Sequence, residues 1–446
     1  MVETTGVDEE VQRVGRSLYA AFPRQRGPLK ALDQRAMDLA AQDQELRAAL
    51  FRLVDVTPAT RSLDDLAQHL TDYLDEVEER TPPVAAAMKM SGTKAGRTAL
   101  GAAAAAGVRR MAHRFIVGES PKAARGKLRS LWDGGEAVSV DLLGEATVTQ
   151  PEADRYAARC LDALDSLAPE VPRWPPRPLL EHDSIGPLPR MNLSVKVSAL
   201  TPLLRPEAPE RGRDDAARRM RPLLVRARET GAHLHIDMES VDTLEATMEL
   251  VFELLDEDEF RDGPSAGIVL QAYLRESPEQ LDRVIEWARS SPRTPPLVVR
   301  LVKGAYWDHE VVAARQHGWS PPVFEVKADC DRNFEELTRR LIDARPLLRP
   351  TIASHNLRSV AHAIAYNRAA GGEDGDIELQ VLRGLGDELA DALVEHGMRV
   401  RVYCPVGDLV AGMAYLVRRL LENTANDSFL GQQHSGVPIE ELLAAP

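Results

Sequence analysis

The chain has 446 residues, of which 44% are hydrophobic and 28% are charged, and its formal net charge is -14 at pH 7. This length fits two or three domains, or one large barrel with a helical attachment, and the apolar content suffices for a sizeable core. The excess of negative charge argues against broad binding to a phosphate backbone. We therefore expect no nucleic-acid partner.

The cysteines and the first residues point to a cytoplasmic protein. Cys160, Cys330 and Cys404 are odd in number and far apart, which excludes a disulfide framework and fits a reducing compartment. The first ten residues are acidic and lack the apolar core of a Sec-type signal peptide. The sequence has no uninterrupted apolar run of about 18 residues, the length that predicts a membrane-spanning helix.

Residues 1–112 are expected to be helical and to form an N-terminal arm or domain. Ser62 stands just before Asp64 and Asp65, which predicts a helix cap. The segment from Lys89 to Arg114 is helical, rich in alanine and basic. Such a segment can contact anionic lipid, so peripheral binding to the cytoplasmic face of the membrane is one interpretation. The alternative is that its cations only solvate a packing helix.

From about residue 138, short β-branched runs alternate with amphipathic segments. Eight such runs over roughly 250–280 residues predict a parallel α/β fold, a (β/α)8 TIM barrel. The Pro-rich stretch 172–189 is expected to be a loop or crossover excursion. The predicted strands are Val138–Leu142, Leu193–Val197, His233–Asp237, Gly267–Tyr273, Leu297–Lys303, Thr351–His355, Ile377–Gln380 and Val400–Tyr403.

Polar side chains stand at or just past the end of every predicted strand. Active sites of such barrels lie on that face, and a buried polar group needs a partner or a ligand. Each residue alone could be a satisfied structural group, but the whole set indicates a site. The set is Asp141, Glu145, Lys196, Ser198, Asp237, Glu239, Gln271, Tyr273, Lys303, Tyr306, His355, Asn356, Gln380 and Tyr403.

A metal centre is not expected. His233, His235 and Asp237 share one face of a predicted strand, and Glu239 follows them. No second cluster of ligands is evident, and the sequence lacks the HExxH and GxxxxGK[ST] patterns.

The segment Tyr415–Glu422 is predicted to be a helix with two faces. Apolar residues form one stripe, while Tyr415, Arg418, Arg419 and Glu422 project from the other side. Two adjacent guanidinium groups steadied by a carboxylate could clamp a substrate carboxylate. The alternative is a solvated face with an Arg–Glu pair, which is common and contributes little.

The segment Val299–Asp308 resembles the flavin-binding strand of bacterial proline dehydrogenases, in particular the proline dehydrogenase domain of bifunctional proline utilisation A (PutA) proteins. Further segments match that family in order, and together they cover about residues 115–430. These segments are Phe115–Glu119, Asp141–Glu145, Ser194–Leu200, Ile236–Glu239, Val269–Tyr273, Ala353–Asn356, Leu379–Gln380, Gly384–Gly386, Arg401–Gly407 and Tyr415–Asn423.

The resemblance implies a distorted barrel over residues 113–430 that binds FAD and oxidises L-proline to 1-pyrroline-5-carboxylate by hydride transfer, the first step of proline catabolism to glutamate. Electrons would pass to a membrane quinone. Residues 431–446 resemble the linker that leads to the aldehyde dehydrogenase domain of bifunctional members. That domain is not in this chain, so 1-pyrroline-5-carboxylate dehydrogenase is expected as a missing domain or a separate partner.

The resemblance also implies residue roles. Asp237 and Arg300 would be catalytic, with Arg300 beside the flavin and Asp237 ordering the polar network. Substrate would be bound by Lys196, Tyr306, Tyr403, Tyr415, Arg418, Arg419 and Glu422, of which the paired arginines take the carboxylate. Cofactor contacts would come from Met238, Gln271, Val302, Lys303, Gly304, Ala305, Trp307, Lys327, His355, Asn356 and Gln380.

Some features depart from the family pattern. Cys330 stands where family members commonly carry Thr, and Cys404 stands where Ala is usual. The N-terminal region shows no ribbon-helix-helix pattern, so DNA binding is not expected. Two other interpretations stay open. The same barrel and flavin could act on hydroxyproline or a reduced folate, with Tyr403 as the residue to test, or the barrel could be a non-catalytic assembly module.

Overall fold

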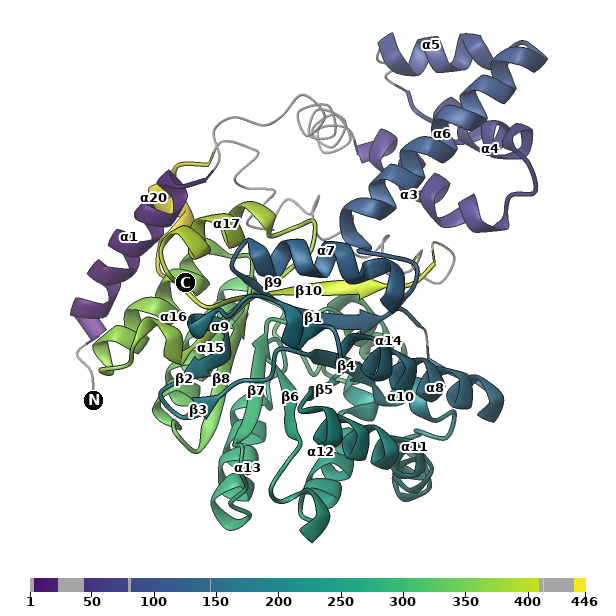
Figure 1. Cartoon of the computed structure of the whole chain (residues 1–446). Coiled ribbons are helices and arrows are strands. Elements are labelled where there is room, and N and C mark those ends of the chain that lie inside the picture. Colours follow the sequence, from purple (N-terminus) through teal and green to yellow (C-terminus); the bar gives the residue numbers. More distant parts are fainter. Residues whose placement is uncertain (1–3, 23–43, 79–81, 145, 409–411, 413–436) are drawn as a thin grey trace.

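The computed structural model describes residues 4–22, 44–78, 82–144, 146–408, 412 and 437–446 (Figure 1). Eight parallel strands close into a barrel in the order β1-β10-β9-β8-β7-β6-β5-β4. Each predicted strand corresponds to one of them, so the predicted (β/α)8 fold is confirmed. The strands are β1 Glu136–Leu142, β4 Asn192–Lys196, β5 His233–Asp237, β6 Ser265–Gln271, β7 Leu297–Val302, β8 Leu348–Ala353, β9 Glu378–Leu382 and β10 Val400–Val406.

Helices surround the barrel and cover the outer face of its strands. After α7 (Pro121–Asp133), each strand of the barrel except the last, β10, is followed by at least one helix before the next barrel strand (Figure 1). These helices are α8 Gln150–Leu167, α10 Val197–Leu200, α11 Pro209–Thr230, α12 Val241–Leu255, α13 Ser277–Ser290, α14 Trp307–His317, α15 Lys327–Asp343, α16 Leu357–Ala369 and α17 Asp387–Glu395. None of the described helices is long and apolar enough to cross a membrane.

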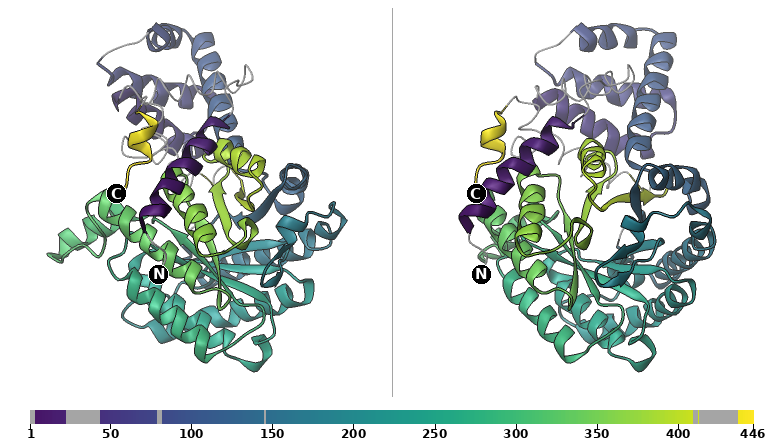
Figure 2. Two further views of the ribbon diagram at one scale, coloured as in Figure 1. Left: turned by 90° about the vertical axis from the view of Figure 1, so that its left-hand side faces the viewer. Right: turned by 60° about the vertical axis from the view of Figure 1, so that its left-hand side comes forward.

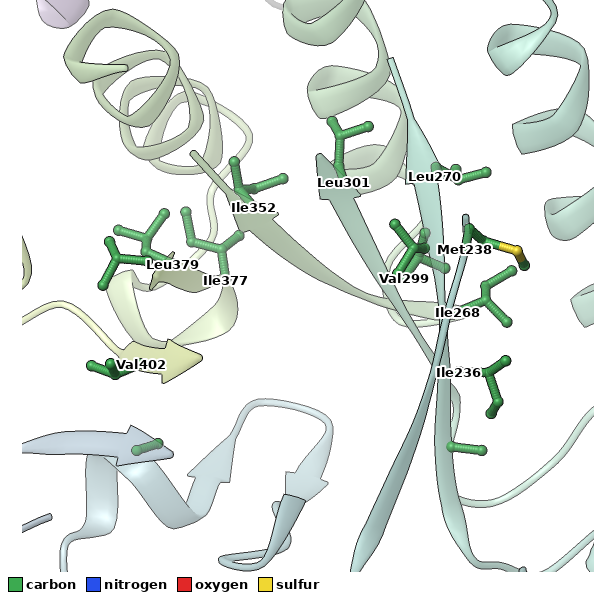
Figure 3. Close-up of a cluster of buried hydrophobic side chains, with 14 of the residues drawn as sticks. Ile236, Met238, Ile268, Leu270, Val299, Leu301, Ile352, Ile377, Leu379 and Val402 are labelled. Carbon is green, nitrogen blue, oxygen red and sulfur yellow. The ribbon is translucent and has the colours of Figure 1, made fainter. Parts of the chain in front are cut away.

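Alternate residues of each strand face opposite sides of the barrel wall. The outward residues are apolar and pack under the helices, as the labelled Ile236, Ile268, Val299, Ile352 and Leu379 illustrate (Figure 3). The inward residues are mostly polar or charged, so the axis of the barrel is filled by hydrogen-bonded side chains. The buried inward set includes Ser139, Asn192, Ser194, His233, His235, Arg300, Thr351, Glu378, Gln380 and Arg401.

The Pro-rich stretch 172–189 carries more structure than predicted. It contains α9 (Pro178–Glu181) and a small antiparallel pair, β2 (His182–Asp183) with β3 (Gly186–Pro187). Trp132 Nε1 donates to the carbonyl of Pro175 at 2.8 Å, which ties the start of the stretch to α7. Because proline limits the regular hydrogen bonding of the backbone, the sequence alone indicated a loop here.

The N-terminal region divides into two parts. Helices α3 to α6 form a lobe that stands away from the barrel, whereas α1 (Thr4–Ala20) lies along its flank (Figures 1 and 2). Ser62 caps α4 as predicted, since its hydroxyl accepts from Asp65 N at 3.1 Å. The remaining lobe helices are α3 Gln44–Val56, α4 Leu63–Asp75, α5 Pro82–Ser91 and α6 Lys94–Phe115.

The long helix α6 joins this lobe to the barrel. Phe115 and Ile116 at its end pack in one apolar cluster with Leu143 and Leu385. Arg114 Nε donates to the carbonyl of Gly384 at 2.9 Å, and Arg97 Nε pairs with Asp64 at 3.0 Å within the lobe. At least two cations of the basic segment Lys89–Arg114, namely Arg97 and Arg114, therefore make contacts within the protein.

Candidate active site

Four predicted site residues meet at the carboxyl ends of the strands. Asp237, the last residue of β5, accepts a hydrogen bond from Arg300 Nη1 at 2.7 Å on Oδ1. Its Oδ2 accepts from the hydroxyl of Tyr403 at 2.7 Å, and Lys196 Nζ lies 3.6 Å from the same oxygen. Lys196 also pairs with Asp141 of β1. The structure therefore brings Lys196, Asp237, Arg300 and Tyr403 together around one carboxylate.

Strand register explains why these residues meet. Lys196 and Asp237 are partners in the β4–β5 pairing, so both lie at the same level at the end of their strands. Arg300 comes from the middle of β7 and is 4% exposed. Its Nη2 donates to Ser194 Oγ at 3.2 Å, and its Cζ lies 5.2 Å from the centre of the Tyr403 ring. These contacts fix the guanidinium inside the barrel.

The electrostatics keep both Lys196 and Tyr403 protonated at neutral pH. Burial alone would lower the pKa of Lys196, but the carboxylates of Asp141 and Asp237 raise that pKa well above its ordinary value. Burial, together with the same two carboxylates, raises the pKa of the Tyr403 phenol. Within this group of described residues, the two cations Lys196 and Arg300 balance the carboxylates of Asp141 and Asp237.

The turn after β7 holds several residues that were assigned to the cofactor or substrate. Gly304, Ala305 and Trp307 are exposed, and Tyr306 and Val302 are half-buried. Gly304 has a φ of +138°, and a side chain there would collide with the ring of Tyr273. The close approach that the structure records at Gly304 is thus to Tyr273. Trp307 Nε1 donates to the carbonyl of Phe324 at 2.9 Å.

Lys303 and Lys327 share one carboxylate at the start of α15. Lys327 Nζ lies 2.5 Å from Asp331 Oδ2, and Lys303 pairs with the other oxygen. Burial opposes ionisation of Asp331, but the two lysines outweigh it and lower its pKa. Two predicted cofactor-binding cations therefore lie side by side, held by a residue that the sequence reasoning did not select.

Two predicted cofactor contacts on the strand ends have structural roles in this fold. Asn356 caps α16, because its Oδ1 accepts from Ser359 N at 3.0 Å. His355 Nε2 accepts from the backbone N–H of Leu382 at 2.9 Å. Both side chains hold local backbone, and their contacts with a cofactor stay predictions.

The other three predicted contacts lie in the interior. Gln380 Nε2 donates to Glu378 Oε1 at 2.7 Å, and Met238 is buried. Gln271 Nε2 donates to the carbonyl of Glu239 at 3.0 Å. Its Oε1 is buried and meets no hydrogen-bond donor among the described residues. Gln271 therefore offers a free acceptor at the end of β6.

Some predicted residues lie outside the described ranges. These are Tyr415, Arg418, Arg419 and Glu422 of the predicted clamp, and Glu145 after β1. Other residues of the site were missed. Ser194 could have been found from its position two residues before Lys196, on the same face of β4. Tyr156, whose hydroxyl accepts from Lys196 N at 3.2 Å, lies on α8 and carried no signal in the sequence.

The two histidines of β5 are in contact with other side chains of the protein. His233 Nδ1 contacts Ser265 Oγ at 2.8 Å, and His233 Nε2 lies 3.0 Å from His235 Nδ1. Asp237, at the other end of the strand, is engaged by Arg300 and Tyr403. Within the described ranges, no group of three His, Cys, Asp or Glu side chains could hold a metal ion.

Comparison with known proteins establishes the family. Residues 124–432 match the family model described as proline dehydrogenase. The chain belongs to the proline dehydrogenase family. Residues 8–115 match the N-terminal domain of proline utilization A. The resemblance seen in the sequence is thereby confirmed.

Relatives of this family include long and short proteins. Bifunctional protein PutA of Klebsiella aerogenes is 33% identical over 350 residues, which cover 76% of this chain and 25% of that protein. Proline dehydrogenase of Deinococcus radiodurans is 28% identical over 322 residues, 72% of this chain and 89% of that protein. The chain spans about a quarter of the length of the bifunctional relatives it matches.

Solved structures agree in fold. The crystal structure of PutA from Bdellovibrio bacteriovorus inactivated by N-propargylglycine matches with a TM-score of 0.90 at 33% identity, over 99% of this chain and 44% of that one. A PutA mutant from Bradyrhizobium japonicum matches with a TM-score of 0.75 at 27% identity, again over 99% of this chain and 46% of that one. The barrel and the helices before it therefore both have counterparts in PutA.

Proposed function

We propose that this chain is an FAD-dependent proline dehydrogenase that oxidises L-proline to 1-pyrroline-5-carboxylate. The observation that carries the proposal is the network of Lys196, Arg300 and Tyr403 around Asp237, at the mouth of the barrel of a member of this family. Barrel enzymes place their chemistry at that end. The reaction removes a hydride from the ring carbon beside the proline nitrogen and a proton from the nitrogen.

The described residues fit a flavin on two counts. Gln271 Oε1 is a buried acceptor and Arg300 Nε a buried donor, and neither has a partner among the described residues. They come from the neighbouring strands β6 and β7, so a flat ring with donor and acceptor edges could satisfy both. FAD, when bound, supplies the acceptor for the hydride. Arg300, a buried cation, would stabilise negative charge that develops beside it.

The protein's own residues would bind and orient the substrate. Lys196 stays protonated, so its positive charge can bind a carboxylate. Asp237 contacts both Lys196 and Arg300 and would hold the two cations in position for the substrate. Tyr403 is fixed by its bond to Asp237 and can pack on an apolar ring. In the proposal, Arg418 and Arg419 complete the carboxylate clamp, Glu422 holds them, and Tyr306 and Tyr415 contact the substrate.

The electron acceptor and partners belong to the same proposal. Electrons would pass to a membrane quinone, through peripheral contact of a cytoplasmic protein with the membrane. The product would be consumed by 1-pyrroline-5-carboxylate dehydrogenase. The match to bifunctional relatives supports that partner. We also propose the division into an N-terminal region to residue 112, a barrel to residue 430 and a tail to residue 446.

The deciding experiment is spectroscopic. The purified chain should carry, or take up, FAD, and anaerobic L-proline should bleach its absorbance. L-hydroxyproline and a reduced folate, added in parallel, should bleach it more slowly or not at all. A protein that cannot be reconstituted with FAD would contradict the proposal. Bleaching by another substrate alone would shift the assignment to that substrate.

The carboxylate clamp has its own test. Arg419→Met should raise KM for proline strongly and leave the flavin content near that of the parent, because the arginine is assigned to the substrate. Removing one partner of a buried charged contact typically costs about 2–5 kcal/mol. Loss of flavin with an unchanged KM would mean that Arg419 binds the cofactor.

A further inference from the structure

A small cavity lies at the amino-terminal end of the barrel, at the opposite end of the strands from Asp237. Its volume is about 20 Å³, and it is closed partly by Leu188 and Pro189 of the segment before β4. A space of this size holds one particle of about the size of a water molecule. Three arginines and one carboxylate contribute to its wall: Arg349, Arg399, Arg401 and Glu378.

One of these arginines is fully engaged. Arg401 Nε and Nη2 bind the two oxygens of Glu378 at 2.8 and 2.9 Å, and Nη1 donates to the carbonyl of Val138 at 2.7 Å. This bidentate pair neutralises itself. It leaves Arg349 and Arg399, which are 3% and 2% exposed, to be balanced by other groups.

Arg349 and Arg399 share the carboxylate of Asp183 behind the cavity, and Arg399 Nε also lies 3.9 Å from Glu378 Oε2. Asp183 Oδ2 lies 3.2 Å from Arg349 Nε and 3.6 Å from Arg399 Nη1, and Arg349 Nη2 donates to Asp183 Oδ1 at 3.2 Å. Asp183 Oδ1 also accepts from the backbone N–H groups of Ile185 and Gly186 at 2.9 and 3.0 Å. The donors therefore gather on Oδ1, whereas Oδ2, which lies nearest to both guanidinium groups, makes no hydrogen bond among the described residues.

The charge at this end does not balance within the described residues. Three guanidinium groups stand against Glu378 and Asp183, so one positive charge is left over. The nearby His233 adds none, because burial lowers its pKa to about 3. An arginine in a protein does not shed its proton to relieve such an excess.

The unused hydrogen-bonding groups are on the same two residues. Nε and Nη1 of Arg349 and Nε and Nη1 of Arg399 are buried, and none of them makes a hydrogen bond among the described residues. Arg349 Nε and Arg399 Nη1 are near Asp183 Oδ2 but outside hydrogen-bond geometry. Buried charged donors without an acceptor are costly and rare in folded proteins. Both side chains line the same small cavity, so one acceptor placed there could serve both.

We propose that this cavity binds one small monovalent anion of the chloride class between Arg349 and Arg399. A single negative charge cancels the excess, and a spherical ion can accept from both guanidinium groups at once. The small volume favours a compact ion over a bulky one. The ion is a structural component of the barrel floor, far along the strands from the hydride-transfer site, so the inference stands independently of the proposed function.

Chloride binding should stabilise the folded protein. Thermal unfolding of the full chain is measured as chloride replaces gluconate at constant ionic strength. The melting temperature should rise by about 1–2 °C for each tenfold increase of chloride above its Kd, since a ligand that binds only the folded state stabilises it by mass action. Bromide should act in the same way, whereas gluconate, a bulky organic anion, serves as the reference ion.

The variants assign the effect to the cavity. Arg399→Met should abolish the chloride response. Arg293→Met is the control, because Arg293 is a half-buried arginine outside the cavity that donates to the carbonyls of Pro264 and Pro295 at 2.7 and 2.9 Å. The control should be less stable but keep the response. Equal melting in chloride and gluconate, or a full response in Arg399→Met, would overturn the proposal.

A crystallographic measurement on the parent chain removes any dependence on folding of the variants. Crystals grown or soaked in bromide should show an anomalous peak between Arg349 and Arg399. Data that show other bound bromide ions but no peak in this cavity would overturn the assignment, whatever the variants do.

Discussion

The two ends of the barrel interior both bury charged side chains, but they differ in how those charges are balanced. At the carboxyl end, Lys196 and Arg300 face Asp141 and Asp237, and the charges are equal. At the amino end, three arginines face two carboxylates. Both clusters arise because alternate residues of each strand face inward, and in this chain most of those residues are polar or charged. Neither burial of charge nor a shared carboxylate therefore distinguishes the two ends, since Asp237 and Asp183 each face two cations, whereas the balance of charge does.

The largest loss of stability is expected from removing Glu378, which pairs with Arg401 at the amino end of the barrel. Glu378→Gln would leave Arg401 buried without its partner, which should cost about 3–5 kcal/mol of unfolding free energy. Burial opposes ionisation of Glu378, but Arg401 and Arg399 lower its pKa to about 2. This group therefore stabilises the protein above its unfolded pKa of about 4.5, and the contribution is lost as the pH falls toward 2.

The same chain provides a matched control for that variant. Arg283 and Glu245 form another bidentate pair, with both contacts at 2.7 Å, but on exposed helices. Glu245→Gln should cost less than about 1 kcal/mol, because exposed ion pairs are screened by water. Urea unfolding at neutral pH measures both. Equal losses would show that burial does not decide the strength of the amino-end pair.

The cluster at the carboxyl end can be disrupted by changing Asp237, the carboxylate that Lys196 and Arg300 share. Asp237→Asn keeps the shape but leaves Arg300 and Lys196 with one carboxylate, Asp141, between them. We expect kcat/KM for proline to fall about 100-fold, which corresponds to about 3 kcal/mol. Stopped-flow reduction of the flavin measures it, with flavin content as the check on integrity. An unchanged rate of reduction would remove Asp237 from the proposed site.

Glu136 is a buried carboxylate that lies in neither cluster and shows what burial does when it outweighs a nearby cation, here Arg383. Burial and the nearby Asp391 and Asp387 raise the pKa of Glu136, at the start of β1, to about 7. Its contribution to stability is present below the unfolded pKa of about 4.5 and is lost as the pH rises to 7. Glu136→Gln should therefore raise the unfolding free energy at pH 8 by about 2 kcal/mol, and much less at pH 5. Urea unfolding at both pH values measures it, and equal effects would show that ionisation of Glu136 is not the cause.

The smallest change removes one hydroxyl from the carboxyl end. Tyr403→Phe deletes the bond to Asp237 Oδ2 but keeps the ring over Arg300. A hydrogen bond to a charged group contributes about 1.5–3 kcal/mol, so proline turnover should fall at least roughly 10-fold. The ratio of rates with proline and hydroxyproline shows whether Tyr403 also selects the substrate. A larger loss than in Asp237→Asn would mean that the phenol acts on the substrate itself.

Much of this arrangement was predictable from the sequence. The alternation of strands and helices predicted the barrel, and the common carboxyl end of parallel strands predicted that Lys196, Asp237 and Tyr403 converge. The contacts of Lys303, Gly304 and Asn356 were not predictable, because a residue's place at a strand end does not say which neighbour it meets. Nor was the position of α1, since an apolar helix face shows that a surface is covered but not what covers it.

Contacts on the flank of the barrel limit how the chain can be shortened. Arg358 of α16 donates to Asp8 of α1 at 2.9 Å and to the carbonyl of Leu443, just after α20 (Ile439–Leu442), at 2.7 Å. Gln12 of α1 donates to the same carbonyl at 2.7 Å, and the Leu443 side chain lies directly against Gly15. Segments more than 400 residues apart in sequence thus form one small interlocked unit. Trimming either segment removes packing from the other, so N-terminal and C-terminal deletions should have non-additive effects on stability.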